Sequence, residues 1–263
     1  MTRRIRRTDH FEITVLITDP AFIRPPRDSQ RNWLLNRAVR EFADDLTALD
    51  EIAERYVPGA DDQSLDTDFA HGILSDNEIM EDWQIPLMRR MAEIASASGG
   101  DVLEVGFGQG VSSSFIQAGG VLSHTIVECN ESVIGRFHEW RRDYPKSDIR
   151  LIEGRWQDVT DQFQQYDAVF LHTYPLSQEE FVEYVSDSVT FAEHFFATAA
   201  GSLKPGGVFT YLTNEIDSMS RGHQRLLPRF FSEFSVSLQE LDLPPDSGDK
   251  WWANSMVIVR ATK

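Results

Sequence analysis

The sequence predicts a doubly wound α/β fold whose sheet has seven mostly parallel strands and an antiparallel last pair. From residue 101 onward, short apolar runs alternate with helical segments, which is typical of a parallel sheet covered by helices on both faces. One apolar run breaks into closely spaced glycines, and the next run ends in a carboxylate. The last two runs are joined by a turn-rich link at 244–249, which suits an antiparallel pair.

The first part of the chain is predicted to be an N-terminal, mainly helical extension. A loosely alternating stretch at 11–18 indicates a strand or an ordered arm, and apolar residues at helical spacing indicate a helix over about 29–56. The acidic, polar stretch at 60–68 is the best linker candidate. We therefore expect an extension at 1–75, serving as an acceptor cap or an oligomer contact, and one main domain at 76–263.

The main domain is expected to begin with a helix from about Pro86 to Ala97, which leads through two glycines into the first strand. Its strands are expected near residues 101–105, 123–128, 149–153, 167–172, 207–212, 235–241 and 254–260.

Composition narrows the function. A net charge of −17 argues against nonspecific nucleic-acid binding, because phosphate contacts need clustered Lys and Arg. The basic cluster at 3–7 is better explained as a solvated terminus. The single cysteine, Cys129, excludes an intrachain disulfide, as expected of a reducing compartment, and a small packed residue is a simpler account of it than a reactive thiol. No apolar run is long enough to span a bilayer and no signal peptide is evident, so we expect a cytoplasmic protein without a membrane partner.

The glycine run and the following carboxylate predict a site for a nucleotide-type cofactor. Gly106, Gly108 and Gly110 let the backbone approach a ligand where a Cβ atom would clash, and the next helix presents free N–H groups. Glu128 follows about 20 residues later, where a carboxylate can accept from both ribose hydroxyls. The spacing is G-x-G-x-G, which weighs against a dinucleotide fingerprint.

Three further segments follow predicted strands. After the third strand, Trp156 can cover an adenine face and Asp158 can accept from the adenine amine. The fourth strand ends at His172, at the carboxyl edge where ligands bind in such sheets. The segment 204–207 reads as a helix stop and a turn that opens the fifth strand.

Several of these segments together resemble guanidinoacetate N-methyltransferase, a class I S-adenosylmethionine methyltransferase with a Rossmann-like fold, over roughly residues 76–215. The matching segments are Ile79 to Met88, Val102 to Gly108, Val127 to Asn130, Thr173 to Ser177 and Leu203 to Gly207. The glycine motif is general to class I methyltransferases, whereas Glu-Cys-Asn and Thr-Tyr-Pro-Leu-Ser are specific to the narrower group.

The resemblance implies S-adenosylmethionine as cofactor, S-adenosylhomocysteine as product, and a small molecule or peptide as methyl acceptor. A second copy of the chain is a further candidate partner. The candidate cofactor residues are Met88, Glu104, Val105, Gly106, Phe107, Gly108, Gln109, Gly110, Glu128, Cys129, Asn130, Arg155, Trp156 and Asp158. The candidate acceptor residues are Met80, Trp83, Gln84, His172, Tyr174, Thr213 and Asn214, and His172 is also the candidate catalytic residue.

Two departures from the family pattern bear on the acceptor. The family holds a guanidinium with one acid after the Trp of its first motif and another just before Thr-Tyr-Pro-Leu-Ser, and this chain has Gln84 and His172 there. A buried guanidinium without a counter-charge is costly. We therefore expect a neutral or anionic acceptor, with a carboxyl oxygen slightly ahead of an amine nitrogen. His172 would take a proton from an amine or, if protonated, orient a carboxylate by a charge-assisted hydrogen bond.

Three alternatives remain at this point. The first is a guanidine or arginine N-methyltransferase with relocated acids, for example Glu81, Asp82 or Glu215. The second is a non-catalytic cofactor-binding module. The third is a nicotinamide dehydrogenase, which the glycine spacing disfavours. The seven histidines are scattered, so the sequence predicts no metal site.

Overall fold

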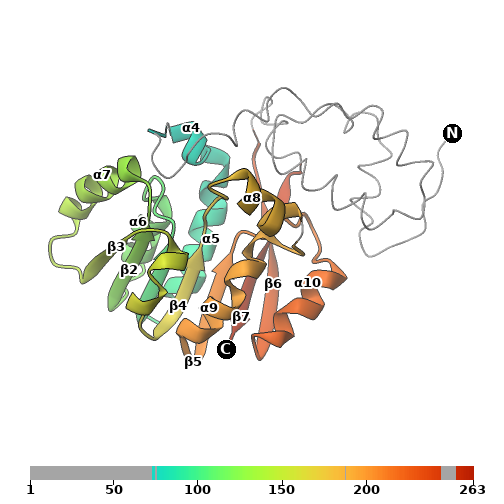
Figure 1. Ribbon diagram of the computed structural model, residues 1–263. Helices are drawn as coiled ribbons and strands as arrows, with labels where there is room; N and C mark the ends of the chain where they lie inside the picture. The colour runs from blue at the N-terminus through green and yellow to red at the C-terminus, as the bar shows by residue number, and fades with distance from the viewer. Residues whose placement is uncertain (1–72, 75, 187, 244–252) are drawn as a thin grey trace.

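The computed structural model describes residues 73–74, 76–186, 188–243 and 253–263, and its centre is a seven-stranded sheet (Figure 1). The strand order is β3-β2-β1-β4-β5-β7-β6. Strands β1 to β5 are parallel, and β7 lies antiparallel between β5 and β6. The strands are β1 Asp101–Val105, β2 Ser123–Glu128, β3 Ile149–Glu153, β4 Tyr166–Leu171, β5 Leu203–Tyr211, β6 Glu233–Glu240 and β7 Ser255–Thr262.

The predicted fold class is confirmed. Strands β1, β2 and β3 have their expected bounds, while β4, β6 and β7 differ from theirs by one or two residues at each end. Strand β5 begins at Leu203 rather than near residue 207. The Lys-Pro-Gly-Gly segment is an irregularity inside the strand, since the pairing with β4 shifts register between Tyr166 and Ala168 and Gly206 has φ 78°. The expected elements at 11–18 and 29–56, the linker at 60–68 and the link at 244–249 lie outside the described residues.

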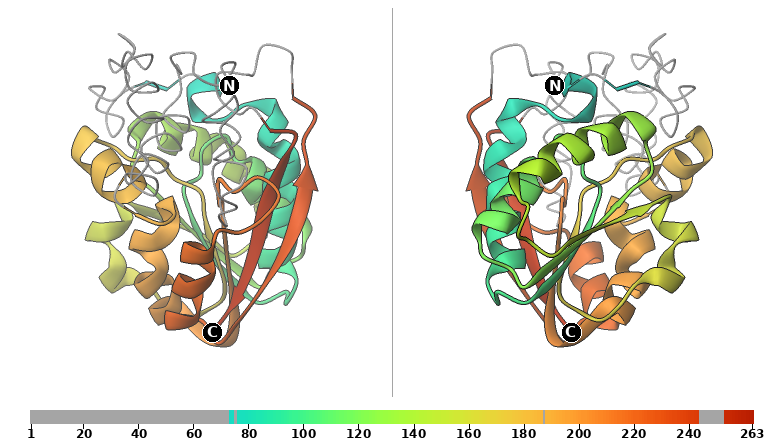
Figure 2. Two further views of the ribbon diagram at one scale, coloured as in Figure 1. Left: turned by 90° about the vertical axis from the view of Figure 1, so that its right-hand side faces the viewer. Right: turned by 90° about the vertical axis from the view of Figure 1, so that its left-hand side faces the viewer.

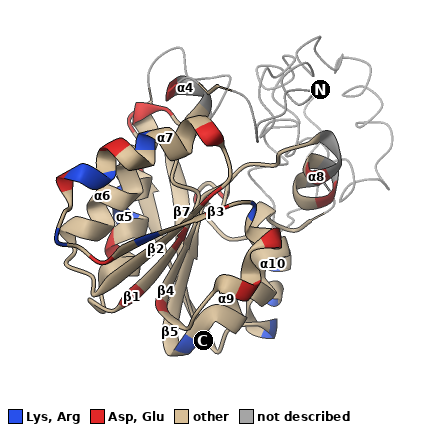
Figure 3. Ribbon diagram, turned by 60° about the vertical axis from the view of Figure 1, so that its left-hand side comes forward, with Lys and Arg blue, Asp and Glu red and all other residues tan. Residues whose placement is uncertain are grey.

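Helices cover both faces of the sheet. Figures 2 and 3 show α5 and α6 on one face and α9 and α10 on the other. The α-helices are α4 Asp76–Ile79, α5 Ile85–Ser96, α6 Val111–Ala118, α7 Glu131–Trp140, α8 Gln178–Phe181, α9 Phe196–Ser202 and α10 Arg221–Leu226. The described chain also contains short 3₁₀-helices and one π-helix. The π-helix is η7 Val182–Ser186, and the 3₁₀-helices are η3 Asp82–Gln84, η4 Arg141–Asp143, η5 Trp156–Asp158, η6 Thr160–Gln162, η8 Phe191–Phe195 and η9 Leu227–Arg229. Within the described part of the chain, none of the helices is both long and apolar enough to cross a bilayer.

The core lies in two layers because the central strands are buried on both faces. Leu87 and Met91 recur at helical spacing on α5 and pack in one layer with Phe170 of β4. In the other layer, Val169 and Phe209 pack with the helices that follow β4. Near-continuous apolar runs in the central strands are what a doubly covered parallel sheet requires.

Three charged side chains join β1, β4 and β5 at the amino ends of these strands. The Lys204 Nζ atom lies 2.7 Å from Asp101 Oδ2 and 2.7 Å from Asp167 Oδ2. Lys204 holds the pKa of both carboxyls below the ordinary value, helped at Asp101 by the Ser123 hydroxyl and at Asp167 by the Asp101 N–H. The two carboxylates in turn raise the pKa of Lys204. This cluster ties the middle of the sheet together opposite the ligand-binding edge.

The cluster makes a prediction about stability and pH. We expect Lys204→Met to lower the melting temperature at pH 7, because two adjacent carboxylates lose their shared cation. A carboxyl with a lowered folded pKa stabilises the protein above its unfolded pKa of about 3.9, and the stabilisation is lost as the pH falls through the folded pKa. The difference between wild type and variant should therefore shrink in thermal melts below pH 4.

The matched control is Arg90→Met, which removes an exposed pair with Glu93 on α5 and should change little. A melting-temperature difference for Lys204→Met that stays constant from pH 7 to pH 3 would contradict the electrostatic explanation.

Candidate functional site

The site lies where the strand order reverses. Strand β1 has β2 on one side and β4 on the other, so the loops after β1 and β4 run to opposite faces of the sheet. In open α/β sheets, this divergence leaves a crevice at the carboxyl ends of the strands, where ligands bind. The loops after β1 and β4 carry the glycines and His172 that the sequence singled out, and β2 ends at Glu128.

The glycine loop is pressed against the end of β4. Gly106, Gly108 and Gly110 have φ values of 94°, 57° and 74°, in the region that side chains rarely adopt. A Cβ atom added to Gly106 would lie 2.1 Å from the His172 carbonyl oxygen. The Gly106 N–H donates to the Val127 carbonyl at 2.9 Å, so the loop is also tied to β2. The backbone therefore approaches the crevice at a distance that only glycine permits.

Glu128 is the acid that organises this side of the crevice. Its carboxylate accepts from the N–H groups of Phe107 at 3.0 Å, Cys129 at 2.8 Å and Asn130 at 3.0 Å. A carboxylate has about four acceptor sites, so capacity remains for a hydroxyl. A glycine cradle that a Cβ would fill, beside a carboxylate held by three backbone amides, fits the S-adenosylmethionine that the sequence implied. Asn130, which also belongs to the predicted set, caps α7 by accepting from Ser132 N and Val133 N.

Two other predicted cofactor residues lie behind the glycine loop. Glu104 is fully buried, and its oxygens accept from the hydroxyls of Ser112 and Ser113 on α6. Its Oε2 atom also lies 3.0 Å from His124 Nε2. The Gln109 amide donates to the carbonyls of Asp76 at 2.8 Å and Met80 at 3.0 Å, which holds α4 against the loop. These contacts indicate that Glu104 and Gln109 hold the glycine loop in its conformation.

Phe107 and Met88 are core residues. Phe107 packs edge-to-face on Phe137 and Trp140. Met88 lies on α5 and is buried in the core layer between this helix and the sheet.

The loop after β3 is joined to η8 and α8. The ring of Trp156 packs edge-to-face on Phe195, with centroids 4.9 Å apart. Arg155 forms an ion pair with Glu180 of α8, whose other oxygen accepts from Leu176 N. Asp158 is exposed. The adenine contacts of Trp156 and Asp158 stay predictions. Glu180 could not be found from the sequence, since no motif or spacing links it to Arg155.

Cys129 is a half-buried free thiol next to Glu128. Burial, and then the charge of Glu128, raise the pKa of this thiol to about 12. A thiol that stays protonated at neutral pH is a poor nucleophile, so the packed-residue interpretation is favoured.

A pocket opens beside the cofactor crevice at the ends of β4 and β5. His172, Tyr174 and Asn214, three of the predicted acceptor residues, line it together. Its lining residues include no Asp, Glu, Lys or Arg among those that the structure describes. The described residues that line it are Leu171, His172, Thr173, Tyr174, Pro175, Phe181, Val185, Phe191, Ala192, Tyr211, Leu212 and Asn214.

Two polar atoms of this pocket are buried without a hydrogen-bond partner among the described residues. They are His172 Nε2 and Asn214 Oδ1. Asn214 also has φ 55°, the only positive φ at a non-glycine residue in the described part of the chain. Unpaired buried polar atoms and strained backbone are both costly and gather at binding sites. These observations make the pocket the candidate acceptor site.

His172 is neutral in this environment. Burial lowers the pKa of its imidazole from 6.5 to about 4, although the charge of Glu104 opposes the shift. The pKa of His172 therefore lies below the working pH, which a residue that takes a proton from an amine would need to match. At neutral pH, His172 lacks the positive charge that a charge-assisted bond to a carboxylate requires.

The other predicted acceptor residues do not line this pocket. The Gln84 side chain accepts from Glu81 N at 3.0 Å, and the Trp83 indole donates to Glu81 Oε2 at 2.7 Å. The Thr213 hydroxyl donates to the Val257 carbonyl on β7 at 2.6 Å. Met80 is buried in the same core layer as the apolar residues of α5. Their contact with an acceptor stays a prediction.

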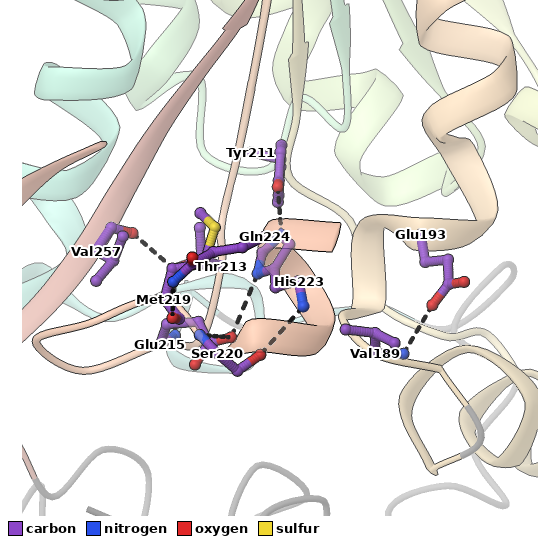
Figure 4. A network of polar contacts seen from close by, with 10 residues as sticks. All are labelled: Val189, Glu193, Tyr211, Thr213, Glu215, Met219, Ser220, His223, Gln224 and Val257. Carbon is purple, nitrogen blue, oxygen red and sulfur yellow. Dashed lines mark hydrogen bonds and ion pairs between the residues drawn. The ribbon is translucent and has the colours of Figure 1, made fainter. Parts of the chain in front are cut away.

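Sequence reasoning also missed a buried chain of polar groups behind the pocket. Tyr211, which lines the pocket, is hydrogen-bonded to His223, and His223 contacts Glu215 (Figure 4). The sequence offers Glu215 only as a relocated acid, and nothing in the local sequence connects it to His223. Within the described residues, no group of three or more His, Cys, Asp or Glu is arranged to hold a metal ion.

Comparisons with known proteins agree with this geometry. The family model for guanidinoacetate N-methyltransferase matches residues 56–253. Protein arginine N-methyltransferase 2 of Saccharomyces cerevisiae is 27% identical over 140 residues, covering 51% of this chain and 32% of that protein. The protein of the same name from Emericella nidulans is 27% identical over 185 residues, covering 66% of this chain and 40% of that protein. The chain thus spans about a third of the length of the first curated relatives that it matches.

Among solved structures, the N-methyltransferase NodS from Bradyrhizobium japonicum WM9, in complex with S-adenosylhomocysteine, has the same fold. Its TM-score is 0.50 at 16% sequence identity, and the match covers 76% of this chain and 97% of that one. Fold, glycine cradle and family match agree. The chain belongs to the guanidinoacetate N-methyltransferase family of S-adenosylmethionine-dependent methyltransferases.

Proposed function

We propose that this chain transfers a methyl group from S-adenosylmethionine to an uncharged nitrogen that carries hydrogen, on a small molecule or a peptide. The observation that supports this acceptor most directly is a pair of buried atoms, His172 Nε2 and Asn214 Oδ1, that have no hydrogen-bond partner among the described residues. They lie in a pocket whose described lining carries no charged residue. An amide oxygen accepts a hydrogen bond, and a neutral imidazole accepts at one of its ring nitrogens. An N–H group is the complement of both.

The residues have distinct parts in this proposal. When bound, S-adenosylmethionine supplies a methyl group activated by its positively charged sulfur. The backbone of Gly106 to Gly110 and the carboxylate of Glu128 hold it at the ends of β1 and β2. His172 and Asn214 hold the acceptor at the ends of β4 and β5, and the apolar residues around them exclude water.

A carboxyl oxygen, slightly favoured from the sequence, is less well supported by the geometry. A carboxylate acceptor would benefit from a cationic side chain, and the described lining offers neutral His172 in its place. We therefore rank nitrogen first and the carboxyl group second.

A guanidine nitrogen of arginine is the second candidate, and the relatives favour it. Both relatives described above are named protein arginine N-methyltransferase 2. Against it, two of the acids considered as substitutes are occupied: Glu81 accepts from Trp83, and Glu215 contacts His223. The matched family region also includes Asp61, Asp62 and Asp66, which lie outside the described residues.

Label transfer from methyl-labelled S-adenosylmethionine to an extract of the host cells would decide among these acceptors. We expect label that resists alkali, because an N-methyl bond is stable where a methyl ester releases volatile methanol. Mass spectrometry of the labelled product then separates methylarginine from other N-methyl groups. Alkali-labile label would contradict the nitrogen acceptor, and methylarginine would establish the second candidate.

The same assay tests the role of His172. We expect His172→Ala to lower the rate of label transfer while S-adenosylhomocysteine still binds in calorimetry. Phe181→Leu, which changes an apolar lining residue and removes no polar atom, is the matched comparison. Full turnover in His172→Ala would contradict the proposed contact.

The remaining features of the proposal concern the whole chain. We propose that residues 1–75 form the acceptor cap or an oligomer contact of a domain at 76–263, and that a second copy of the chain is a candidate partner. The net charge of −17 supports an acceptor other than nucleic acid. A cytoplasmic location stays part of this proposal.

A further inference from the structure

A buried polar chain connects the acceptor pocket to the interior of the domain. Tyr211, at the end of β5, lines the pocket, and its hydroxyl lies 2.5 Å from His223 Nε2 on α10. On the other side of the ring, His223 Nδ1 lies 3.3 Å from Glu215 Oε1. Figure 4 shows the three side chains in sequence, from Tyr211 through His223 to Glu215. Tyr211 and His223 are fully buried, and Glu215 is 8% exposed.

The two partners of His223 indicate its tautomer and therefore the direction of the hydrogen bonds. A carboxylate only accepts, so the Nδ1–H of a neutral His223 donates to Glu215. His223 Nε2 then carries a lone pair and accepts the Tyr211 O–H. The oxygen of Tyr211 is therefore left as an acceptor, which again suits an N–H group in the pocket.

Neighbouring residues hold the side chains of His223 and Glu215 in place. Glu215 Oε1 also accepts from Ser220 N at 3.3 Å, and the Ser220 hydroxyl caps α10 by accepting from His223 N at 3.3 Å. The rings of Phe196 and Tyr211 pack against His223. The other titratable group in Figure 4, Glu193, accepts from Val189 N at 2.7 Å. Burying three titratable side chains is costly unless each of them makes its hydrogen bonds. Buried titratable groups that contact one another are typical of functional sites.

Methyl transfer to a nitrogen that carries hydrogen leaves a proton to be removed. The nitrogen forms a bond to the methyl carbon, the carbon–sulfur bond breaks with its electron pair staying on sulfur, and one N–H proton departs. His172 holds a proton poorly, because burial lowers its pKa to about 4. Burial and the charge of Glu215 raise the pKa of Tyr211 well above its ordinary value, so its hydroxyl stays protonated at neutral pH.

We propose that Tyr211, His223 and Glu215 form a proton relay that takes up the N–H proton of the methyl acceptor, an inference that rests on the proposed function. The acceptor proton moves to the Tyr211 oxygen, the Tyr211 proton moves to His223 Nε2, and the Nδ1 proton of His223 moves to Glu215. Tyr211 contacts the acceptor, whereas His223 and Glu215 are positioning residues that act through it.

The relay is tested with the variants Tyr211→Phe and Glu215→Gln. The control is Gln224→Met, because Gln224 lies next to His223 on α10 and its side chain donates a hydrogen bond to the Met219 carbonyl that the substitution removes. The probe is methyl-labelled S-adenosylmethionine with host-cell extract, assayed at increasing extract concentration from pH 6 to pH 9. We expect maximal rates about 10²-fold lower for Tyr211→Phe and Glu215→Gln, the usual size of a general-base contribution. The half-saturating extract concentration of Glu215→Gln should stay close to wild type, because Glu215 does not contact the acceptor. The S-adenosylhomocysteine affinity of both variants, and the rate of the control, should also stay close to wild type. Glu215→Gln should also change the dependence of the rate on pH, because it removes the group that receives the proton at the end of the relay.

A second measurement is independent of turnover. In NMR spectra of the protein labelled with ¹⁵N-histidine, the Nδ1–H proton of His223 should be protected from exchange in wild type and Gln224→Met. It should shift in Glu215→Gln and in Tyr211→Phe. An active wild type whose relay variants keep its rate and pH profile would overturn the relay and leave the proposed function standing. A wild type that labels nothing would overturn both, and an unprotected Nδ1–H would overturn the relay alone.

Discussion

A Gly106→Ala variant is expected to lose cofactor binding almost completely. The added Cβ atom would lie 2.1 Å from the His172 carbonyl oxygen, which is backbone and cannot turn aside. The residue would also have to keep a φ of 94°, which costs a non-glycine residue roughly 1–3 kcal/mol. Together these effects should weaken S-adenosylhomocysteine binding by about 100-fold or more, or roughly 3 kcal/mol. Isothermal titration calorimetry measures the change directly.

The control for this variant is Gly135→Ala on α7. No atom lies within 4 Å of a Cβ added at Gly135. In the middle of a helix, alanine is favoured over glycine by up to about 1 kcal/mol, so this variant should melt at the same temperature or higher and bind the cofactor normally. Equal affinities for the two variants would show that the glycine loop is more adaptable than its contact with β4 implies.

The second large effect is expected for Glu128→Ala. The substitution leaves the N–H groups of Phe107, Cys129 and Asn130 without their acceptor and removes the carboxylate proposed to hold the ribose. Losing a buried acceptor costs about 1–3 kcal/mol, which corresponds to about a 10- to 100-fold rise in the dissociation constant for S-adenosylhomocysteine. Calorimetric titration, together with a thermal melt, separates lost affinity from lost stability.

Glu153→Ala is the matched comparison for Glu128. Glu153 pairs in register with Glu128 at the end of the neighbouring strand, and its side chain is exposed. It carries the same charge at the same edge of the sheet, so a general electrostatic effect would appear in both variants. If both variants bind the cofactor like wild type, the ribose assignment is refuted.

The cofactor side was largely predictable from the sequence because its parts lie close together in the chain. The glycine loop and Glu128 fall within one strand-helix-strand unit, where backbone geometry fixes their relative positions. Strands β1, β2 and β3 also have the expected bounds, because each is an apolar run bounded by polar residues or glycine. Strand β5 was expected to begin too late, since a Pro-Gly-Gly segment resembles a turn even where it continues a sheet.

The acceptor side could not be predicted in the same way. Its lining comes from β4, α8, η7, η8 and β5, and no spacing rule relates residues on elements that meet only through tertiary packing. The neutrality of His172 is a property of its surroundings and not of its sequence position. The hydrogen bonds that connect Tyr211, His223 and Glu215 form because α10 packs near the end of β5. The sequence around His223 does not predict this contact.

The half-buried thiol beside Glu128 has a practical consequence for labelling chemistry. The chain contains one cysteine, and with a pKa of about 12 roughly one thiol in ten thousand is ionised at pH 8. Maleimide dyes react with the thiolate, so the native residue should stay unmodified. A cysteine introduced at an exposed position such as Leu122, which is 71% exposed, would then be the single site of attachment. Fluorophores could report on cofactor exchange without altering the residue next to Glu128.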